Sequence, residues 1–265
     1  MNHPYKSYEW DGRSSIDPAA FERVSIVIHL AGAGVFDKRW TEGYKQTILN
    51  SRVESTQFLL QSIKTYGPDV KLIIGSSASG YYGGHLHDRI FDETSPSGDD
   101  FLAGVCRAWE EAYSANRPQG VRLAIIRTGI VLSPVGGAYA RLKQLFKMGI
   151  GSPMGTGHQI MPWIHSHDLC RLYAALAEDA AEGVYNGVAP EKINNRDFSK
   201  ELARCHFHGW MLPAVPSFLL ALVLGESATV LTTGAYLSTA KVEALPFRFQ
   251  FPTLRAALAD IEQRA

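Results

Sequence analysis

Two hydrophobic periods alternate along the chain from Val24 onward. Short β-branched runs, VSIVIHLAGAG, VKLIIGSS and VRLAIIRTGIVL, are typical of buried strands. Between them, WTEGYKQTILNSRVESTQFLLQSIKTYG and FLAGVCRAWEEAYSAN carry apolar residues at helical spacing. Strands that alternate with helices pair in parallel through right-handed crossovers, and the helices cover both faces of the sheet. The pattern therefore predicts an α/β fold built on a doubly wound parallel sheet.

The second half of the chain continues the alternation less regularly. AYARLKQLFKMG reads as a helix, and a further helix begins near His167 or Asp168. GVYNGVAP is typical of a strand, and Asn194 or Asn195 caps the next helix. The remaining tail, rich in prolines and aromatic residues, indicates a small C-terminal lobe. We expect a sheet domain over residues 1–150, and a substrate-side segment with this lobe over residues 151–265.

Charge and cysteine content narrow the classes of function. The 265 residues include 26 basic and 26 acidic side chains, so the formal net charge is zero. Without an excess of positive charge, we expect neither nucleic acid nor a membrane surface as a partner. The three cysteines are far apart, the N-terminus has no leader, and Pro213 and Pro216 break the most apolar run. These features predict a cytoplasmic protein with reduced thiols, and they leave its oligomeric state open.

A phosphate-binding turn is missing from the start of the chain. A doubly wound sheet that binds a dinucleotide begins with a strand, a glycine-rich turn and a helix, because the diphosphate needs close backbone approach. Residues 1–23 contain one glycine, Gly12, and no G-x-G-x-x-G. The strand of that unit is normally central, so its loss leaves the neighbouring strand unpaired on one side. We therefore expect an N-terminally truncated version of the fold.

Five blocks in a fixed order make the chain resemble a known family. They are HLAGAGVFDKRWTEGYKQTILNSRVEST, SSASGYYG, DDFLAGVCRAWEEA, RTGIVLSPVGGA and GTGHQIMPWIHSHDL, and the tail from PAVPSF to LRAALADI resembles the family's C-terminal segment. This family is the atypical, epimerase-like branch of the short-chain dehydrogenases/reductases. The resemblance implies a Rossmann-like fold and an NAD(P) cofactor, with NADP favoured over NAD. Because the glycine-rich turn is missing, loss of cofactor binding is an alternative.

The resemblance places the cofactor at the carboxyl ends of the strands. Small residues after the first strand let the backbone approach a ligand, and the strand RTGIVL would run beneath the nicotinamide. The bends at Ala31, Ser77 and Gly129 are expected to converge on one rim of the sheet. The implied cofactor contacts are Leu30, Ala31, Gly32, Ser76, Arg127, Thr128 and Gly129.

The stretch GSSASGYYGG, residues 75–84, carries the candidate chemistry. A serine nucleophile needs G-x-S-x-G on a strand-to-helix elbow, and this stretch is one residue too long for it. In the resembled superfamily, a hydroxyl after this strand hydrogen-bonds the substrate oxygen, and Ser77 matches that place. The alternative is a capped turn whose serines are solvated.

The proton donor is indicated less directly. The wider superfamily uses Tyr-x-x-x-Lys, in which the lysine lowers the pKa of the tyrosine. By the family's spacing, Leu102 and Cys106 stand at those two positions. The phenols of Tyr81 and Tyr82, beside the serine turn, are candidates to replace the missing tyrosine. The candidate catalytic residues are therefore Ser77, Tyr81 and Tyr82.

Cationic, aromatic and imidazole side chains are candidates for holding a substrate. Arginine binds anions by bidentate contacts, and the segment GTGHQIMPWIHSHDL would reach a cleft beside the C-terminal lobe. The alternatives are ion pairs of the arginines with Glu42, Glu54 or Glu110, and ordinary core or surface roles for the histidines. No metal site is expected, because CHFH and HLHD lack a second ligand pair. The substrate candidates are Arg39, Trp40, Arg52, His158, Trp163 and His165.

These inferences predict an NAD(P)-dependent oxidoreductase or epimerase that acts on a small polar molecule of nucleotide-sugar type. Two alternatives remain. One is a catalytically silent binding or regulatory protein of the same fold, which the missing dyad and the missing glycine-rich turn favour. The other is a serine hydrolase.

Overall fold

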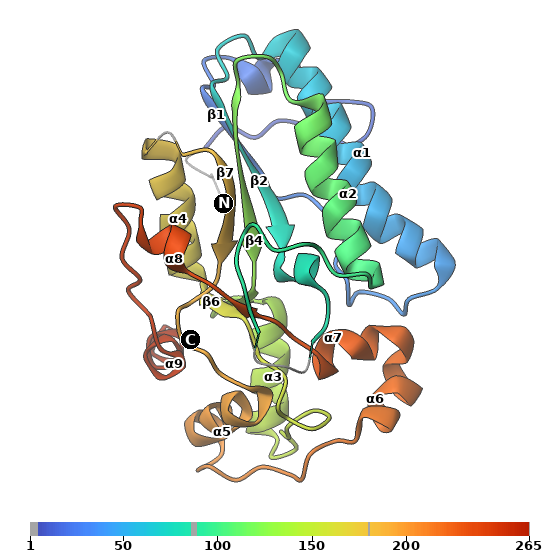
Figure 1. Ribbon diagram of the computed structural model, residues 1–265, viewed down its shortest axis with the longest axis vertical. Coiled ribbons are helices and arrows are strands. Elements are labelled where there is room, and N and C mark those ends of the chain that lie inside the picture. Colours follow the sequence, from blue (N-terminus) through green and yellow to red (C-terminus); the bar gives the residue numbers. More distant parts are fainter. Residues whose placement is uncertain (1–4, 86–88, 180, 265) are drawn as a thin grey trace.

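The computed structural model describes residues 5–85, 89–179 and 181–264, and its centre is a four-stranded parallel sheet (Figure 1). The strand order is β1-β2-β4-β7, so neighbours in the sheet follow one another along the chain. The predicted α/β fold with a parallel sheet is confirmed. The strands are β1 (Ile26–His29), β2 (Leu72–Ala78), β4 (Arg122–Thr128) and β7 (Gly183–Gly187).

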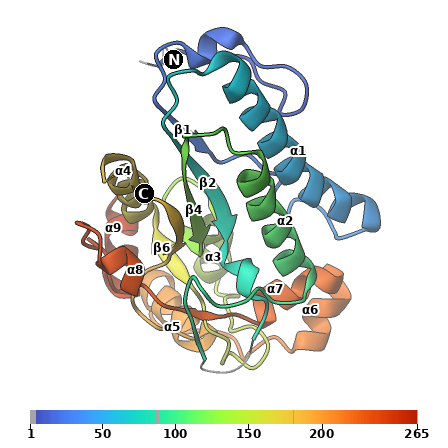
Figure 2. The same ribbon diagram turned by 45° about the horizontal axis from the view of Figure 1, so that its top comes forward.

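Helices cover both faces of this sheet. α1 (Glu42–Tyr66) and α2 (Phe101–Asn116) lie on one face, and α4 (Ser166–Glu178) lies on the other (Figures 1 and 2). Successive side chains of a strand point to opposite faces. Ile73 therefore joins the apolar cluster beneath α1 and α2, and Ile74 joins the cluster beneath α4. Burial of both faces explains why the strands read as continuous apolar runs.

The third apolar run forms two strands where the sequence predicted one. β4 ends at Thr128, and the chain continues as β5 (Ile130–Leu132), which pairs with β6 (Trp163–His165) outside the main sheet. A Cβ atom on Gly129, between the two strands, would lie 2.6 Å from the carbonyl oxygen of Pro162. Only glycine fits this close crossing of two backbones, and the chain leaves the main sheet there.

A second core lies beside the small sheet. Three helices, α3 (Gly137–Lys147), α5 (Asn195–His206) and α9 (Leu254–Gln263), pack around Trp163. Asn194, one of the two residues expected there, caps α5. Because β7 comes from the second half of the chain, the main sheet extends across the expected domain boundary at residue 150.

The remaining elements are short. They are η1 (Pro18–Phe21), η2 (Ser79–Tyr82), β3 (Ile90–Phe91), α6 (Ser217–Leu224), η3 (Gly225–Ala228), α7 (Thr229–Thr232), β8 (Tyr236–Leu237) and α8 (Ala240–Glu243). None of the helices in the described ranges is long and apolar enough to cross a membrane.

The start of α4 differs from the expectation. His165 caps the helix, because its Nδ1 accepts a hydrogen bond from the His167 N–H at 3.0 Å. Asp168 is buried and accepts hydrogen bonds from the N–H groups of Gln250 and Phe251 at 2.9 and 2.8 Å. Neither His167 nor Asp168 is the cap, and the Asp168 carboxylate instead fastens the C-terminal segment to α4.

β1 is an edge strand of the main sheet. The Leu72 N–H donates to the Ser25 carbonyl oxygen, so alternate residues from Ser25 face β2 and the backbone groups of Ile26 and Ile28 point outward. No strand of the described residues pairs with this outer side. One side of β1 is thus open, as expected for a sheet without the strand that normally lies there.

Candidate functional site

The carboxyl ends of three strands meet on one rim of the main sheet. Parallel pairing places His29 opposite Gly75 and Ala78 opposite Thr128. The bends that follow β1, β2 and β4 therefore leave the sheet side by side. The expected convergence at Ala31, Ser77 and Gly129 follows from this register. In open α/β sheets, ligands bind at such a rim.

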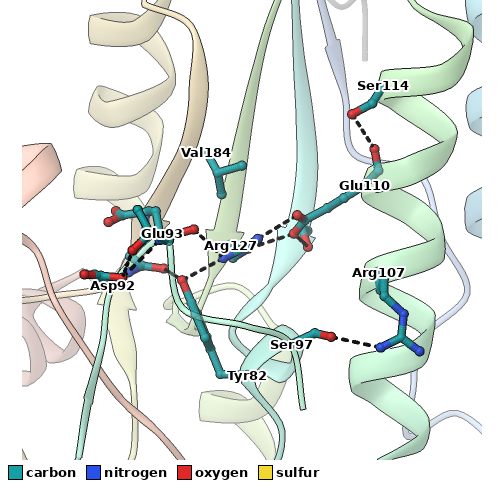
Figure 3. Close-up of polar contacts among 12 residues, drawn as sticks. Tyr82, Asp92, Glu93, Ser97, Arg107, Glu110, Ser114, Arg127 and Val184 are labelled. Carbon is teal, nitrogen blue, oxygen red and sulfur yellow. Dashed lines mark hydrogen bonds and ion pairs between the residues drawn. The ribbon is translucent and has the colours of Figure 1, made fainter. Parts of the chain in front are cut away.

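A buried ion pair lies just inside the rim. Arg127, on β4, donates from Nε and Nη2 to the two carboxylate oxygens of Glu110, on α2, at 2.9 and 2.8 Å. Ser77, next to Arg127 in the register of β2 and β4, donates its hydroxyl to Glu110 Oε1 at 2.7 Å. All three side chains are nearly inaccessible to solvent. Figure 3 shows the Arg127 guanidinium between Glu110 and Tyr82.

Tyr82 closes the other end of this network. Its hydroxyl donates to Asn186 Oδ1 at 2.7 Å and accepts from Arg127 Nη1 at 2.9 Å. Burial raises the pKa of Tyr82 to about 12, against the opposing effect of the Arg127 charge. The phenol therefore stays protonated at neutral pH, and the two strongest hydrogen-bonding directions of its oxygen are occupied.

Two of the three catalytic candidates thus point away from any ligand at the rim. The hydroxyls of Ser77 and Tyr82 belong to the buried network, because Ser77 bonds to Glu110 on one side of Arg127 and Tyr82 bonds to Arg127 and Asn186 on the other. Tyr81 differs from them. Its half-buried ring lies over the Arg127 guanidinium, 3.3 Å from ring centroid to carbon, and its hydroxyl has no hydrogen bond within the described residues. Tyr81 is the phenol that remains available.

The opposite face of the sheet holds a second hydroxyl pair. Ser76 alternates with Ser77 and faces α4, where its hydroxyl lies 2.9 Å from the hydroxyl of Tyr173. Burial raises the pKa of Tyr173. Thr128 is half-buried at the end of the neighbouring strand. The hydroxyl of Ser76, a predicted cofactor contact, therefore already has a partner inside the protein. At the neighbouring strand, the rim begins where β4 ends at Thr128.

A depression of about 540 Å³ lies beside the end of β1. Small residues of the bend after β1 and of α1 form one wall, and the N-terminal segment forms the other. Leu30, expected at the cofactor, is 65% exposed at this bend. The lining residues are Trp10, Asp11, Gly12, Arg13, Ser14, Ala31, Gly32, Ser51 and Ser55.

Arg52 supports the depression from the side of α1. Its Nη1 donates to the Ile48 carbonyl oxygen at 2.9 Å, and its guanidinium lies over the Trp109 ring. A Cβ atom on Gly32 would lie 3.2 Å from this guanidinium. Glycine at this position therefore leaves room for Arg52 beside the bend. Burial lowers the pKa of Arg52 from its usual value.

His29 is buried next to the depression, and sequence reasoning missed it. Its Nδ1 lies 2.6 Å from the hydroxyl of Tyr113, and its Nε2 lies 3.4 Å from the hydroxyl of Ser55. Burial lowers the pKa of His29 to about 4. The imidazole is therefore neutral at pH 7 and holds β1 to α2 and α1.

Most of the substrate candidates do not gather at the rim. Trp163 is fully buried in the second core. His165 is the cap of α4, with its Nε2 3.3 Å from Asp260 Oδ2, and burial lowers its pKa. His158 is exposed on a separate loop. We expected these three side chains to line a substrate cleft. Instead, Trp163 packs in a core, His165 caps a helix and His158 lies on the surface.

Arg39 and Trp40 lie on the loop between β1 and α1. Arg39 is exposed, and a Cβ atom on Gly225 would lie 3.2 Å from its Nε. The Trp40 indole donates to the Val35 carbonyl oxygen at 2.8 Å, and its ring contacts Phe101. Arg39 is thus available to a ligand, whereas Trp40 shapes the loop.

The two short histidine motifs were not expected to bind metal. Residues 86–88 of HLHD lie outside the described residues. In CHFH, the His206 Nε2 lies 3.1 Å from the hydroxyl of Tyr139. Within the part of the chain that the structure describes, no group of three histidine, cysteine or carboxylate side chains is arranged to hold a metal.

One sequence signal for the buried network was present. Glu110 falls on the apolar face of α2, in register with Cys106 and Tyr113. A carboxylate on a buried face requires a cationic partner, and Arg127 lies in a strand interior where arginine is equally unusual. The other members, Asn186 and the Glu93 backbone, come from distant segments and carry no such signal.

Two family models match the chain. The NAD dependent epimerase/dehydratase family matches residues 8–189, and a domain of unknown function, DUF1731, matches residues 215–261. An Arabidopsis thaliana protein described as a chloroplastic homolog of the epimerase family protein SDR39U1 is 37% identical over 243 residues, which are 90% of this chain and 69% of the relative. An epimerase family protein of Mycobacterium tuberculosis is 34% identical over 252 residues, which are 94% of this chain and 82% of the relative.

Solved structures agree with these matches. The crystal structure of the human epimerase family protein SDR39U1 with NADPH has a TM-score of 0.85 at 32% identity, covering 91% of this chain and 83% of that one. A UDP-glucuronic acid 4-epimerase from Bacillus cereus, with NAD, has a TM-score of 0.69 at 17% identity, covering 93% and 75%. The second structure shares the fold.

Proposed function

Because the chain belongs to the NAD-dependent epimerase/dehydratase family, we propose that it binds a nicotinamide dinucleotide, NADP in preference to NAD, along the carboxyl rim of its main sheet. The observation that carries this proposal is the convergence of the bends at Ala31, Ser77 and Gly129, the first of which lines the depression at the end of β1. The human relative that was crystallised with NADPH supports it.

The rim residues fit one half of such a cofactor. The small side chains of Ala31 and Gly32 leave the backbone accessible, as the ribose and nicotinamide require. No glycine-rich turn for the diphosphate precedes β1 in the described residues. Two cations lie beside the depression and are the candidates to bind the phosphates: Arg13, which lines it, and Arg52, which packs against Gly32. When bound, the nicotinamide would accept or donate a hydride.

We assign the proton-transfer role to Tyr81, in an oxidoreductase or epimerase acting on a small polar substrate of nucleotide-sugar type. Ser77 and Tyr82 already hold their hydrogen bonds inside the protein, and a leucine and a cysteine stand where the usual tyrosine and lysine would be. Arg127 holds the Tyr81 ring in place from beneath. The proposed setting is the cytoplasm, which the three unpaired cysteines support.

Calorimetric titration with NADPH and with NADH tests the binding site. Ala31→Trp fills the depression and is expected to weaken NADPH binding by at least about tenfold. Ala115→Trp, an exposed position on α2 outside the rim, is the matched control and leaves the affinity unchanged. If the unsubstituted protein binds neither nucleotide, the proposal fails.

Turnover tests the role of Tyr81. UDP-glucuronic acid and UDP-glucose, each with NADP, are the probes. Nicotinamide absorbance follows net oxidation of the probe, and chromatography of the nucleotide sugars follows epimerisation, which returns the hydride and leaves the absorbance unchanged. Tyr81→Phe should lower the rate roughly 10²- to 10⁴-fold without weakening NADPH binding, because only the exchangeable proton is lost. Tyr66→Phe, an exposed tyrosine at the end of α1, serves as the control.

One observation favours a second candidate, a dinucleotide-binding protein without turnover. The hydroxyls of Ser77 and Tyr82 are closed inside the ion-pair network, which stabilises the rim and supplies nothing to a substrate. NADPH binding with no turnover of either probe would select this candidate. A serine hydrolase has less support, because the partner of Ser77 is a carboxylate already paired with Arg127 and the partner of Ser76 is a tyrosine.

A further inference from the structure

Helix α6 exposes apolar side chains over most of its surface. Its sequence, SFLLALVL, contains no charged residue, and none of its side chains is buried. Phe218, Leu222 and Val223 are 70%, 73% and 72% exposed. Figures 1 and 2 both show α6 at the periphery of the molecule, away from the main sheet.

Further exposed apolar side chains lie beyond α6, on two neighbouring segments and on the ends of α3 and α5 next to them, where a Cβ atom on Gly149 would lie 2.9 Å from the Phe207 ring. The Leu212 N–H donates to the Gly151 carbonyl oxygen, and the Val215 N–H donates to the Pro153 carbonyl oxygen, so residues 210–216 run beside residues 150–154. The rings of Phe207 and Trp210 are in contact at 5.6 Å. We call this surface the apolar strip, and its members are Leu145, Met148, Ile150, Phe207, Trp210, Leu212, Phe218, Leu219, Leu222 and Val223.

Exposure of so many apolar side chains to water is unfavourable in free energy. More than half of the exposed large apolar side chains that the structure describes lie in it. Monomeric soluble proteins rarely expose a continuous apolar patch of more than a few hundred Å², and larger ones mark association sites. An eight-residue helix also has little stability of its own, so α6 needs apolar contacts to hold its conformation.

We propose that the apolar strip is the interface between two copies of this chain. The exposed parts of its ten side chains amount to the order of 1,000 Å², and a standard interface takes about 800 Å² from each partner. A two-fold axis brings the strip against itself, apolar side chains against apolar side chains. The interface is carried mainly by the segment of unknown function, residues 215–261, and by the loop before it. It does not depend on the proposed cofactor.

The absence of charge on α6 argues for a second copy over other occupants. Interfaces of transient partners are about as polar as ordinary surface, whereas permanent homodimers bury apolar patches. An interfacial membrane helix carries lysine or arginine on one face, and α6 carries none. The zero formal net charge of the chain also removes a general repulsion between copies.

Sedimentation velocity on the full chain tests the proposal. We expect the unsubstituted protein to sediment at twice the monomer mass at micromolar concentration. Val223→Glu buries a charge in the interface and should raise the dimer dissociation constant at least about 30-fold. Val135→Glu is the matched control, since Val135 is 92% exposed and lies outside the strip. This variant should remain dimeric.

Each other outcome overturns the proposal. A monomer at every concentration, or a dimer that survives Val223→Glu and also Leu222→Lys, excludes the strip as the interface. Open-ended aggregates exclude a closed two-fold contact. Flotation of the monomer with phosphatidylcholine vesicles would show that lipid covers the strip instead. Circular dichroism confirms folding of each variant, which is expected because the substituted side chains are exposed.

Discussion

Glu110 compensates the buried charge of Arg127. Burial alone would lower the pKa of Arg127, but the hydrogen bonds and charge of Glu110 raise it above its usual value. The side chain of Arg127 is 3% exposed and that of Glu110 is 11% exposed. Removal of either partner leaves a buried charge without compensation.

Substitution of Arg127 should therefore be costly. Arg127→Leu is expected to lower the free energy of unfolding by about 3–5 kcal/mol, measured by urea denaturation. Arg117→Leu is the matched control, because Arg117 pairs with Glu182 while both side chains remain exposed. Its cost should stay below about 1 kcal/mol. Equal costs for the two variants would contradict the structural role assigned to the buried pair.

His29 makes stability depend on pH. Its pKa is about 4 in the folded protein and 6.5 when unperturbed, so only the unfolded chain binds a proton between these values. The stabilisation is complete above pH 6.5 and is lost as the pH falls from 6.5 to about 4, by about 3 kcal/mol in total. His29→Gln should show a correspondingly smaller fall in its urea midpoint over this range. The carboxylates titrate in both proteins and contribute equally to the two curves of urea midpoint against pH. Parallel curves would therefore exclude His29 as a source of the pH dependence.

Gly129 determines where an element ends. The crossing of β5 over the segment before β6 leaves no room for a side chain, since a Cβ atom would also lie 2.9 Å from Val188. Gly129→Ala should lower the unfolding free energy by about 1–3 kcal/mol. Gly43→Ala in α1 meets no atom within 4 Å and should raise it by up to about 1 kcal/mol. The same denaturation series compares the two, and a neutral Gly129→Ala would mean that the backbones can separate.

Elements with a clear period could be predicted from the sequence. The strands after Val24, Val70 and Val121, and helices α1 and α2, follow from apolar spacing within each segment. The break at Gly129 could not, because the carbonyl oxygen that excludes a side chain belongs to Pro162, far along the chain. The helix cap at His165 was missed because its ring nitrogen replaces the usual oxygen acceptor.

The same division holds for the candidate site. The rim follows from parallel strands, so its three bends could be placed from the sequence. Alternation puts Ser76 and Ser77 on opposite faces, but it does not identify Glu110 as the acceptor of Ser77. That bond requires the packing of α2 on the sheet. Local sequence therefore predicted which strand ends form the rim, and it left open which hydroxyl there lacks a partner inside the protein.

For the whole molecule, association through the apolar strip makes stability depend on concentration. A dimer that dissociates on unfolding has a melting temperature that rises with protein concentration. We expect this rise for the unsubstituted protein and for Val135→Glu, and no dependence for Val223→Glu. Thermal melts over a dilution series measure it. A melting temperature that is constant for all three proteins would be inconsistent with a folded dimer.

The order of strands in the main sheet also bears on synthesis of the protein. Each strand lies beside the one translated before it, from β1 through β2 and β4 to β7. A chain emerging from the ribosome can therefore extend its sheet at a single advancing edge, without waiting for distant segments. The exception is the second core, because the backbone at Gln250 must return to Asp168 and helix α9 must pack beside Trp163. This core can close only after Leu254–Gln263 has left the ribosome, later than any strand of the main sheet.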